Sequence, residues 1–418
     1  MEPARPFHDP RMRGFRSRTS VEAVLALIDR RVGRLSLESI DPRSAAGRVM
    51  ASEVVAEAPV PAFDRAAMDG YAVRGEETLG ADSYSPIPFT IVGRVRPGAV
   101  STIRVGPGEA AEIATGAPLP AGADTVVRVE ATEVDGRIVR VSEPTPPGRH
   151  VGREGEDIAR GAVVLSAGRV LRPQDLGLLS SIGLDRVEVV RRPVVAIIVT
   201  GDELQPAGIR PDGSRIADAN SPMLAALACR DGGIPAVIGP LPDDREAIRS
   251  AIVDAARSAD VLLISGGSST GPEDHAPGLI AELGELAVHG VAIRPASPAG
   301  LGFLGPIPVV LLPGNPVSCL CAYDFFAGPI VRRLGGRPPG WPYRPRVLPL
   351  ARKLASVVGR VDYARVSVVD GRVEPLAISG ASILSSTTRA DGFVVIPADL
   401  EGHPEGASVT VWHYDQDG

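Results

Sequence analysis

The sequence has few aromatic residues, few cysteines and no long apolar run. Aromatic side chains make up 4% of the 418 residues and apolar residues as a class make up 44%, so any core must be built from Val, Ile, Leu and Ala. The cysteines have no zinc-ligand spacing and are too few for a disulfide framework, which favours a reducing, cytoplasmic compartment. They are Cys229, Cys319 and Cys321.

Two further classes of protein are excluded by what is missing. No segment approaches the roughly 18 uncharged apolar residues that a membrane-spanning helix requires. The arginines near the N-terminus are not followed by the apolar stretch of a signal peptide, so residues 1–19 are expected to form a mobile tail. The net charge of −6 argues against general nucleic-acid binding, which usually leaves a basic footprint. We therefore expect neither a membrane nor a nucleic acid as a partner.

Glycine and proline, by contrast, are abundant. The 47 glycines and 40 prolines make up about a fifth of the chain, where average usage is about an eighth. Turns should therefore be frequent. The length predicts two to four domains, because a single core rarely grows to this size.

The first half of the chain combines a few helices with short β segments. Residues 20–32 carry apolar side chains at helical spacing after Ser20, a suitable N-cap. Residues 41–55, which begin with Asp-Pro, predict a second helix, and residues 172–184 predict a third. Between about 60 and 170, β-rich runs alternate with turns, which is typical of a small β domain.

Strands and helices alternate from Pro193 onward. Short apolar runs such as VVAIIVT and VLLIS are separated by amphipathic helical segments. This pattern predicts a three-layer α/β domain, in which a mostly parallel sheet has helices on both faces. Beyond residue 341 the sequence is β-rich again, which suggests a barrel or a sandwich.

Three polar loops follow strands of the predicted parallel sheet. They are TGDEL at 200–204, GGSSTGPEDH at 266–275 and PGNPVS at 313–318. Ligands of open parallel sheets bind outside the carboxyl ends of the strands. These loops are therefore expected to form one crevice.

Each loop offers groups that suit a phosphorylated ligand. The glycine-rich loop offers backbone N–H groups and hydroxyls, with no side chain on Gly266 or Gly267 to block approach. Asn315 and Pro316 are suited to start a helix, whose N-terminus attracts anions. Carboxylates at the same edge are suited to hold Mg²⁺ beside a phosphate. The hydroxyls are those of Ser268, Ser269 and Thr270, and the carboxylates are those of Asp202, Glu203, Asp218, Glu273 and Asp274.

Ordinary structural roles remain open for these loops. PGNPVS is also a good helix start, TGDEL is also a common turn with a cap, and His275 is also an ordinary solvated loop residue. No Walker-type phosphate loop and no suitably placed dinucleotide fingerprint occurs. From the residues alone, we interpret the chain as a cytoplasmic α/β enzyme or binding protein for an anionic, phosphorylated ligand.

The predicted β domain carries a second polar cluster. FDRAAMDGYAV at 63–73 places Asp64 and Asp69 near the start of a strand, and Thr115 lies in a turn bounded by Pro and Gly. EGEDI at 154–158 adds further acids. Each acid taken singly is also explained as a solvated cap.

Six strings occur in the order and spacing of one known family. MDGYAV, ATGAPLPAGADTVV, GREGEDI, TGDEL, GGSSTGPED and LLPGNPVS resemble motifs of the molybdopterin molybdenumtransferases, and the resemblance spans roughly residues 20–410. The chain is also similar to the E domain of gephyrin. The resemblance implies a magnesium-dependent enzyme of molybdenum cofactor biosynthesis. Such an enzyme inserts molybdenum from molybdate into adenylylated molybdopterin and hydrolyses the adenylate, releasing AMP.

The resemblance also implies a fold of four parts and several partners. The parts are an elongated helical and β region split between 20–60 and 161–192, a β lid domain at 61–160, a three-layer molybdopterin-binding α/β domain at 193–341, and a C-terminal β barrel at 342–418. Family members form homodimers in which the α/β domain of one chain and the lid of the other share the site. Molybdopterin adenylyltransferase and the recipient molybdoenzymes are implied as protein partners.

Residue roles follow from the resemblance at matching positions. Asp69, Asp218, Asp274 and Glu203 are expected to be catalytic, and the last three are also expected to hold Mg²⁺. We expect Asp274 to be the main metal-linked carboxylate near the pyrophosphate. The residues expected to bind the pterin nucleotide are Thr115, Asp157, Gly266, Gly267, Ser269, Arg294, Pro313, Gly314, Asn315, Pro316, Ser318 and, through a loose alignment of GASILSS, Ser385.

The chain departs from the family pattern in two places. FDRAAMDG stands where the family has FDNSAMDG, so that Arg65 and Ala66 replace an Asn–Ser pair, or the serine aligns with Ala67. IRPASPAG keeps a cation at Arg294 but has Ser297 where the family has the second lysine of a Lys-Pro-Gly-Lys-Pro string. Loss of that point charge is expected to weaken anion binding. A non-catalytic molybdopterin-binding or delivery paralogue, an interaction scaffold, and the use of tungstate therefore remain alternatives.

Overall fold

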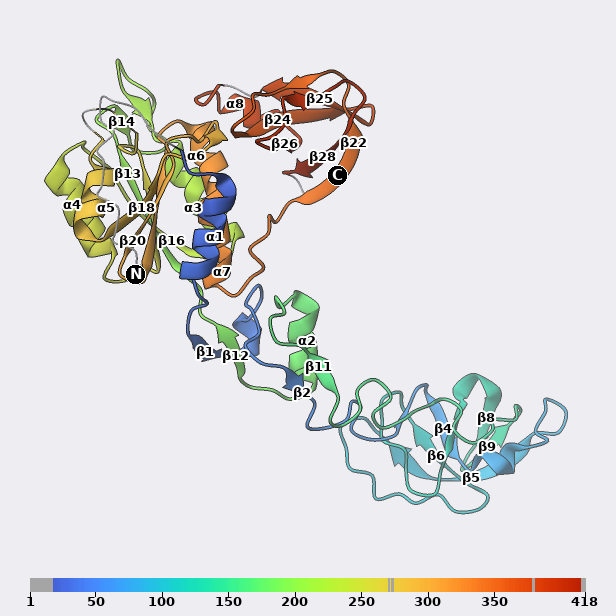
Figure 1. The fold of residues 1–418 in the computed structure, drawn as a ribbon. Coiled ribbons are helices and arrows are strands. Elements are labelled where there is room, and N and C mark those ends of the chain that lie inside the picture. The colour runs from blue at the N-terminus through green and yellow to red at the C-terminus, as the bar shows by residue number, and fades with distance from the viewer. Residues whose placement is uncertain (1–17, 270, 272–273, 378–379, 415–418) are drawn as a thin grey trace. The chain divides into compact units, whose positions relative to one another are not determined.

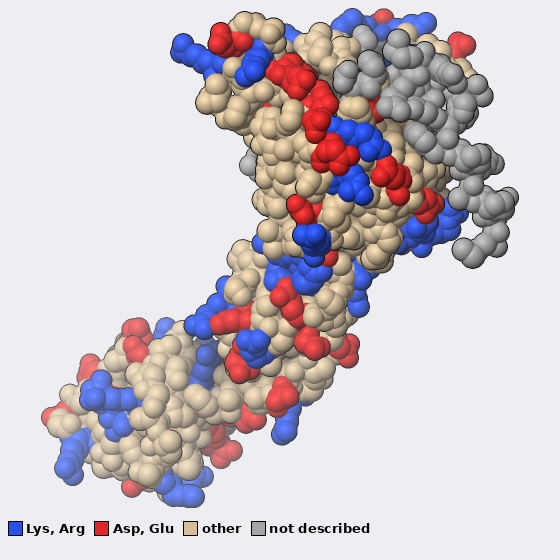
Figure 2. Space-filling model, turned by 90° about the vertical axis from the view of Figure 1, so that its left-hand side faces the viewer, with Lys and Arg blue, Asp and Glu red and all other residues tan. Residues whose placement is uncertain are grey.

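The computed structural model describes residues 18–269, 271, 274–377 and 380–414. Residues 1–17 of the predicted tail lie outside this range. The chain divides into two compact units: unit 1 comprises residues 1–38, 47–49 and 189–418, and unit 2 comprises 39–46 and 50–188. No helix in the described ranges is long and apolar enough to cross a membrane. On the face shown in Figure 2, basic and acidic side chains are intermingled.

Unit 1 contains a six-stranded sheet of order β16-β13-β17-β21-β20-β18 (Figure 1). The first four strands in this order are parallel, and the last two are antiparallel to their neighbours. The prediction of a mostly parallel sheet is therefore confirmed. The strands are β13 (Val194–Thr200), β16 (Ile234–Leu241), β17 (Val261–Ser265), β18 (Glu285–His289), β20 (Gly300–Leu304) and β21 (Ile307–Leu312).

Helices cover both faces of this sheet, which confirms the three layers. Val195 and Ile197 of β13 pack in one core with α1, α3 and α7, whereas Ala196 and Ile198 pack in another with α4 and α5. The two sets alternate because successive side chains of a strand point to opposite faces. The helices are α1 (Val21–Arg31), α3 (Asn220–Arg230), α4 (Arg245–Ala255), α5 (Ala276–Leu283), α6 (Pro316–Ala322) and α7 (Gly328–Leu334), with the π-helix η4 (Tyr323–Ala327) between the last two.

The N-terminal helix α1 forms as predicted. The backbone N–H of Ala23 donates to Ser20 Oγ over 3.2 Å, and the apolar positions Val21, Val24 and Ile28 are buried. The helix packs on the α/β core within unit 1. The boundaries of the four predicted domains stay predictions.

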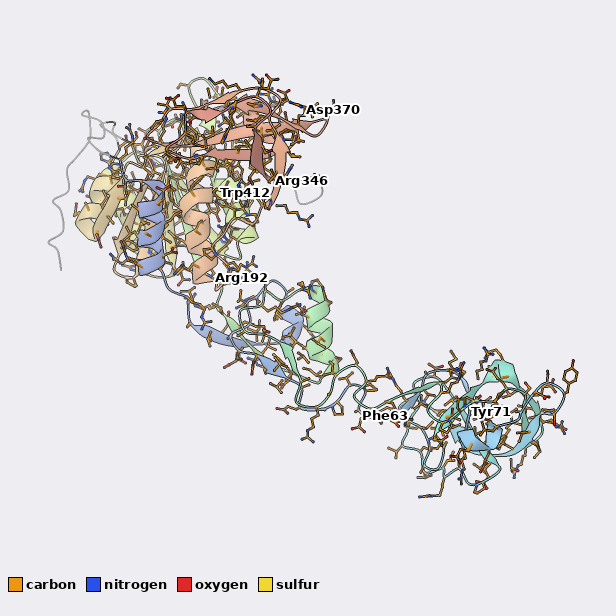
Figure 3. The ribbon with its side chains drawn as sticks, turned by 45° about the vertical axis from the view of Figure 1, so that its right-hand side comes forward. Phe63, Tyr71, Arg192, Arg346, Asp370 and Trp412 are labelled. Atoms are coloured by element: carbon orange, nitrogen blue, oxygen red, sulfur yellow. The ribbon has the colours of Figure 1, made fainter. Side chains whose placement is uncertain are left out.

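The C-terminal part of unit 1 is β-rich, as predicted. Its strands pair in the order β19-β24-β26-β28-β22, with β25 added on β24, and Figure 3 labels Arg346 on β22 and Trp412 on β28. A closed barrel stays a prediction. The elements are β14 (Leu204–Gln205), β15 (Ile216–Ala217), β19 (Ile293–Arg294), β22 (Arg344–Pro349), β23 (Leu354–Ala355), β24 (Val361–Val369), β25 (Arg372–Ala377), α8 (Ser385–Thr388), β26 (Gly392–Ile396), β27 (Gly402–His403) and β28 (Ser408–His413).

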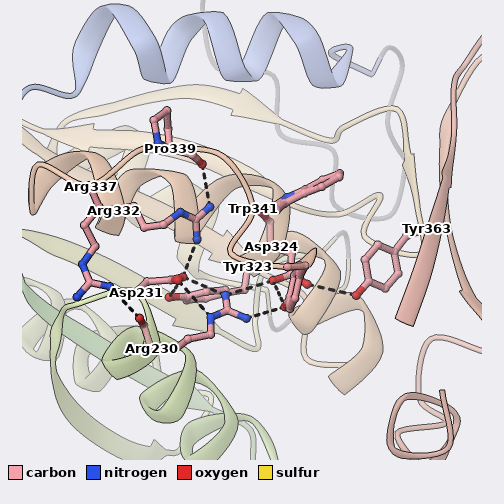
Figure 4. A network of polar contacts seen from close by, with 10 residues as sticks. Arg230, Asp231, Tyr323, Asp324, Arg332, Arg337, Pro339, Trp341 and Tyr363 are labelled. Atoms are coloured by element: carbon pink, nitrogen blue, oxygen red, sulfur yellow. Dashed lines mark hydrogen bonds and ion pairs between the residues drawn. The ribbon is translucent and has the colours of Figure 1, made fainter. Parts of the chain in front are cut away.

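A buried polar network joins the helices of the α/β layer to the C-terminal sheet (Figure 4). Asp231, after α3, accepts hydrogen bonds from Tyr323 Oη (3.0 Å) and Arg332 Nη1 (2.8 Å). Asp324 accepts from Tyr363 Oη over 3.2 Å, and burial raises the pKa of Asp324 to about 6. Since Tyr363 belongs to β24, the network ties this sheet to η4.

Unit 2 contains a second six-stranded sheet, of order β7-β4-β6-β5-β9-β8. This confirms the small β domain, whereas its action as a lid stays a prediction. The predicted helix at 172–184 is α2. The elements are β1 (Leu37–Ile40), η1 (Pro42–Ser44), β2 (Val54–Val55), β3 (Arg65–Ala66), β4 (Gly70–Val73), η2 (Gly75–Thr78), β5 (Ile87–Val95), β6 (Glu109–Ile113), β7 (Thr125–Arg128), η3 (Val129–Ala131), β8 (Thr132–Asp135), β9 (Ile138–Val141), β10 (Val151–Gly152), β11 (Val163–Leu165), α2 (Pro173–Ser181) and β12 (Val187–Val190).

The helix predicted at residues 41–55 is wrong. Asp41 caps only a short 3₁₀ turn, in which its Oδ1 accepts the backbone N–H of Arg43 over 2.8 Å. Gly47 then adopts a φ of +73°, a left-handed conformation that ends helices. The segment ends as strand β2. The start signal at Asp41 was correct, but the residues after the 3₁₀ turn do not continue as a helix.

Candidate functional site

A pocket of about 520 Å³ lies at the carboxyl edge of the parallel strands in unit 1. Residues from the loops after β13 and β17 and from the turn after β21 line it, which confirms that the three predicted loops form one crevice. The volume is within the usual range for small-molecule sites, about 300–1,000 Å³. The predicted residues that line it are Glu203, Gly266, Gly267, Ser268, Ser269, Asp274, Pro313, Gly314, Asn315 and Pro316.

The glycine-rich loop after β17 approaches β13 closely at Gly266. Gly266 has a φ of +96°, and a Cβ there would lie 2.2 Å from the carbonyl oxygen of Thr200. Ser268 Oγ donates to the carbonyl of Leu312 at the end of β21 (3.0 Å), and His289 Nε2 of β18 lies 2.9 Å from the carbonyl oxygen of Ser268. The loop is therefore held by contacts from several strands.

A Gly266→Ala variant is expected to lose about 2 kcal/mol or more of unfolding free energy, because both the backbone conformation and the contact with Thr200 become strained. Gly314→Ala is the matched control: its Cβ would meet nothing nearer than 3.7 Å. Urea denaturation of both variants tests the expectation. Equal midpoints for the two would contradict the role assigned to Gly266.

Asn220, in the first turn of α3, ties two of the loops together. Its Nδ2 donates to Ser265 Oγ (2.9 Å) and to the carbonyl of Gly314 (2.7 Å). Asp218 Oδ1 accepts the backbone N–H groups of Asn220 (2.9 Å) and Ser221 (3.0 Å), so this buried carboxylate satisfies the first two N–H groups of α3. Asp218 does not line the pocket. Its predicted catalytic and metal-holding roles stay predictions.

Three acidic residues line the pocket, and two of them are fixed by backbone contacts. Asp243, after β16, exchanges hydrogen bonds with the loop after β13: its N–H donates to Asp202 Oδ1 (3.1 Å), and the N–H of Asp202 donates to Asp243 Oδ2 (3.3 Å). Asp274 Oδ2 accepts the N–H of Gly271 and closes the glycine-rich loop. Glu203 is exposed. The described lining includes no Lys or Arg.

Three residues that line the pocket carry a buried oxygen atom without a hydrogen-bond partner among the described residues. Thr200 Oγ1, Asn220 Oδ1 and Asp243 Oδ1 are buried and accept no hydrogen bond within the part of the chain that the structure describes. Buried polar atoms are normally paired, so their grouping around one pocket indicates a ligand. Oxygen donors of this kind suit Mg²⁺. No three His, Cys, Asp or Glu side chains form a metal-binding group among the described residues, so Glu203, Asp218 and Asp274 do not gather as a cluster.

Other predicted residues of unit 1 lie away from this pocket. Arg294 lines a second pocket. Ser318 is buried, and its Oγ donates to the carbonyl of Pro295 over 2.9 Å. Ser385 is exposed at the start of α8, whereas Ser382 lines the first pocket. Two residues of the glycine-rich loop, Thr270 and Glu273, lie outside the described residues.

Three predicted residues belong to unit 2. The backbone N–H and the hydroxyl of Thr115 donate to Asp69 Oδ1 (2.6 and 2.8 Å), and these bonds lower the pKa of Asp69. Asp157 is exposed. Arg65, introduced by the departure from the family pattern, forms an ion pair with Glu156 over 3.5 Å. The added cation therefore has its own counter-ion.

Sequence reasoning missed Asp243 and Ser382. Asp243 was open to detection, because β16 is also a parallel strand and ends at Leu241, two residues earlier. The carboxyl-end rule applies to β16 as it does to its neighbours. Ser382 lies in GASILSS, the string in which the loose alignment selected Ser385, so the segment was found but the serine that lines the pocket was not.

Comparison with known families covers nearly the whole chain. Residues 19–183 match the MoeA N-terminal region (domain I and II), residues 196–333 match a probable molybdopterin binding domain, and residues 347–414 match the MoeA C-terminal region (domain IV). A solved structure titled as the molybdopterin biosynthesis MoeA protein from Pyrococcus horikosii is similar with a TM-score of 0.81 and 34% identity, over 96% of this chain and 100% of that one.

Two curated proteins are similar over most of their length. A putative molybdopterin biosynthesis protein of Methanocaldococcus jannaschii is 36% identical, over 90% of this chain and 92% of that protein. Molybdopterin molybdenumtransferase 2 of Mycobacterium tuberculosis is also 36% identical, over 88% of this chain and 93% of that protein.

The fold and the pocket define a multidomain α/β protein with a ligand site at the carboxyl edge of its sheet. The similarity then makes the assignment specific. The chain belongs to the molybdopterin molybdenumtransferase family.

Proposed function

We propose that this protein is a molybdenum insertase, which transfers molybdenum from molybdate to adenylylated molybdopterin. In the accompanying hydrolysis, water adds to the phosphoanhydride and the bond to the AMP phosphate breaks, so that AMP and molybdenum cofactor leave. The observation that carries the proposal is the pocket at the sheet edge, where a glycine-rich loop meets carboxylate and amide oxygens. Family membership supports the choice of substrate, since related proteins are named molybdopterin molybdenumtransferases.

The charges of the pocket support a phosphate bridged by a metal ion. Glu203, Asp243 and Asp274 line it without a basic side chain among the described residues. Like charges 4 Å apart repel by about 4 kcal/mol near a protein surface, so a pyrophosphate needs a cation beside these carboxylates. Mg²⁺ usually keeps several waters and takes one or two carboxylates together with substrate phosphates, so a cluster of three is not required. When bound there, Mg²⁺ would polarise the phosphoryl oxygens.

Within this proposal the chain's own residues bind and orient the ligand. Asp243 and Asp274 would hold Mg²⁺, and the 266–269 loop would bind the phosphate beside it. Asn220 fixes the 313–316 turn against β17 through its two donated hydrogen bonds. Asp218 acts through the position of Asn220, because it accepts the first N–H groups of the helix on which Asn220 lies. Asp69, Thr115 and Asp157 are proposed to contribute from the partner subunit of a homodimer.

Removal of the metal is expected to stop AMP release. The purified protein, treated with EDTA and then desalted, should release AMP at less than about a hundredth of the untreated rate, since metal stabilisation of phosphoryl charge is worth several kcal/mol. Adding Mg²⁺ back should restore the rate. Chromatographic measurement of AMP tests this, and continued release from protein verified to be metal-free would exclude the assigned role of Mg²⁺.

Rescue of molybdoenzyme activity tests the proposed function in cells. The gene is expressed in cells that lack their own insertase, with nitrate reductase activity as the readout. Restored activity supports insertion of molybdenum. Absent rescue, with molybdopterin binding by the purified protein intact, would favour the non-catalytic delivery paralogue, and repeating the assay with tungstate in the medium separates the two metals.

A further inference from the structure

A surface segment of unit 1 borders the pocket at the sheet edge. Residues 206–215, which we call the strap, connect β14 to β15 and extend away from the sheet (Figure 1). Leu204 and Ile216, which flank the strap, both line the pocket. Every residue of the strap is exposed. The strap therefore lies at the rim of the pocket, and its two ends are continuous with the pocket wall.

The base of the strap is fixed by backbone contacts, whereas the strap itself is not. The N–H of Ile216 donates to the carbonyl of Glu203 over 2.8 Å, and the N–H of Asp218 donates to the carbonyl of Gln205 over 2.9 Å. Within the part of the chain that the structure describes, the hydrogen bonds of residues 206–215 join only residues of the strap to each other. The strap can therefore move about its base without breaking a hydrogen bond to the α/β layer.

Two glycines of the strap are suited to act as hinges. Gly208 has a φ of +84° and Gly213 has a φ of +58°. A Cβ at either position would meet no atom within 4 Å, so packing does not require glycine there. What glycine provides is a backbone that changes conformation at little cost. Residues of this kind, near the two ends of a segment, can absorb the change in dihedral angles when a loop closes.

The strap carries positive charge beside an acidic pocket. The side chains of Arg210 and Arg215 form no ion pair and no hydrogen bond within the described residues. The described lining of the pocket has three carboxylates and no Lys or Arg. A phosphorylated ligand adds further negative charge to this pocket, and guanidinium groups suit phosphate oxygens because they donate paired hydrogen bonds. The strap therefore holds the basic groups that the pocket itself lacks.

Closure of the strap would also bury apolar surface. Ile209, on the strap, is 52% exposed, and Ile216, at its end, is 53% exposed. An apolar side chain gains free energy when it leaves water. The open position of the strap is thus one in which both its charged and its apolar side chains lack contacts.

We propose that the strap closes over the pocket at the sheet edge when a phosphorylated ligand is bound, and that Arg215, together with Arg210, then binds the phosphate oxygens. This inference rests on the proposed function in taking the ligand to carry a pyrophosphate. Closure would exclude bulk water from the phosphoanhydride, so that hydrolysis depends on a water molecule positioned within the pocket.

Calorimetric titration of the full-length protein with inorganic pyrophosphate in the presence of Mg²⁺ tests the role of Arg215 without turnover. We expect Arg215→Ala to bind about 10-fold more weakly than wild type, the usual effect of losing a charged hydrogen-bond donor. Arg215→Lys should recover part of the affinity, because lysine keeps the charge but not the paired donors. Arg30→Ala is the matched control, since Arg30 is also exposed and does not line the pocket.

Limited digestion with trypsin tests the closure itself. Trypsin cleaves after arginine but not before proline, so it should cut the strap at the bond between Arg215 and Ile216 and spare the bond after Arg210. Saturating Mg²⁺ and pyrophosphate should slow this cleavage about 10-fold or more, because cleavage follows the population of the open state. The bond between Arg137 and Ile138, in the turn between β8 and β9, is the internal reference and should be cut at an unchanged rate.

Arg210→Ala separates closure from shielding by the ligand. This variant should lose part of the protection at saturating pyrophosphate, because one of the groups that holds the strap closed is missing. Equal protection of wild type and Arg210→Ala would show that the ligand alone shields the bond and would overturn the closure.

The remaining outcomes separate this inference from the proposed function. Absent binding of pyrophosphate by wild type, or equal affinities of wild type and Arg215→Ala, overturns the role of the strap. Because neither measurement requires turnover, a protein whose strap closes on pyrophosphate but which releases no AMP from adenylylated molybdopterin contradicts the insertase function and leaves the strap standing.

Discussion

An Asp274→Asn variant should release AMP about 10²–10³-fold more slowly than wild type, the range expected when a main electrostatic group is lost. The substitution removes one negative charge from the pocket and keeps the shape of the side chain. The amide oxygen of Asn can still accept the N–H of Gly271, so the glycine-rich loop should keep its course. The loss should therefore appear in turnover and not in stability.

The matched control for this variant is Asp254→Asn. Asp254 is an exposed carboxylate on α4, it pairs only with Arg257 among the described residues, and it does not line the pocket. The Asp254→Asn variant should therefore release AMP at the wild-type rate. AMP release and the urea midpoint are measured for both variants. Near-wild-type AMP release by Asp274→Asn would remove Asp274 from the metal-holding set.

The largest effect on stability is expected from Asp231→Ala, at about 3–5 kcal/mol of unfolding free energy. Asp231 is fully buried and accepts hydrogen bonds from Arg332, which is itself only 3% exposed, and from Tyr323. Removal of the carboxylate leaves the guanidinium buried without its counter-ion. The link between the end of α3 and the continuous η4–α7 segment would be lost with it (Figure 4).

An exposed ion pair of the same unit provides the comparison. Asp29 Oδ1 lies 2.6 Å from Arg333 Nη1, and the Asp29 side chain is 60% exposed. Asp29→Ala should cost less than about 1 kcal/mol, because water screens an exposed pair. Urea denaturation of the two variants distinguishes the effects. Equal losses for Asp231→Ala and Asp29→Ala would contradict the role assigned to the buried network.

The elements that the sequence predicted well are those with a strong local signal. Ser20 followed by apolar residues at helical spacing gave α1, and the apolar strand runs with polar loops gave the pocket edge. The failed helix at 41–55 had a start signal but contained Gly47, whose left-handed conformation depends on the surrounding fold. Local patterns therefore located strand ends and helix starts better than they located where a helix stops.

The direction in which a side chain points could not be predicted from the sequence. Asp218 and Asp243 both lie at the edge of the sheet, but Asp218 turns to the N–H groups of α3 whereas Asp243 lines the pocket. Only packing decides which carboxylate accepts the N–H groups of a helix and which faces a ligand. The contact of Arg18 with Ser297 is of the same kind, since no local pattern links residues so far apart. This contact changes the interpretation of Ser297. A cation, Arg18, lies beside the position at which the family has its second lysine.

The most direct test of the proposed activity is a reaction of the purified protein with adenylylated molybdopterin, molybdate and Mg²⁺. We expect AMP and molybdenum cofactor in equal amounts, with neither formed when molybdate and Mg²⁺ are both omitted. Cofactor is measured by reconstitution of an apo-molybdoenzyme, and Asp274→Asn serves as the inactive control. Tight binding of the adenylate without AMP or cofactor formation would contradict the assignment as an insertase.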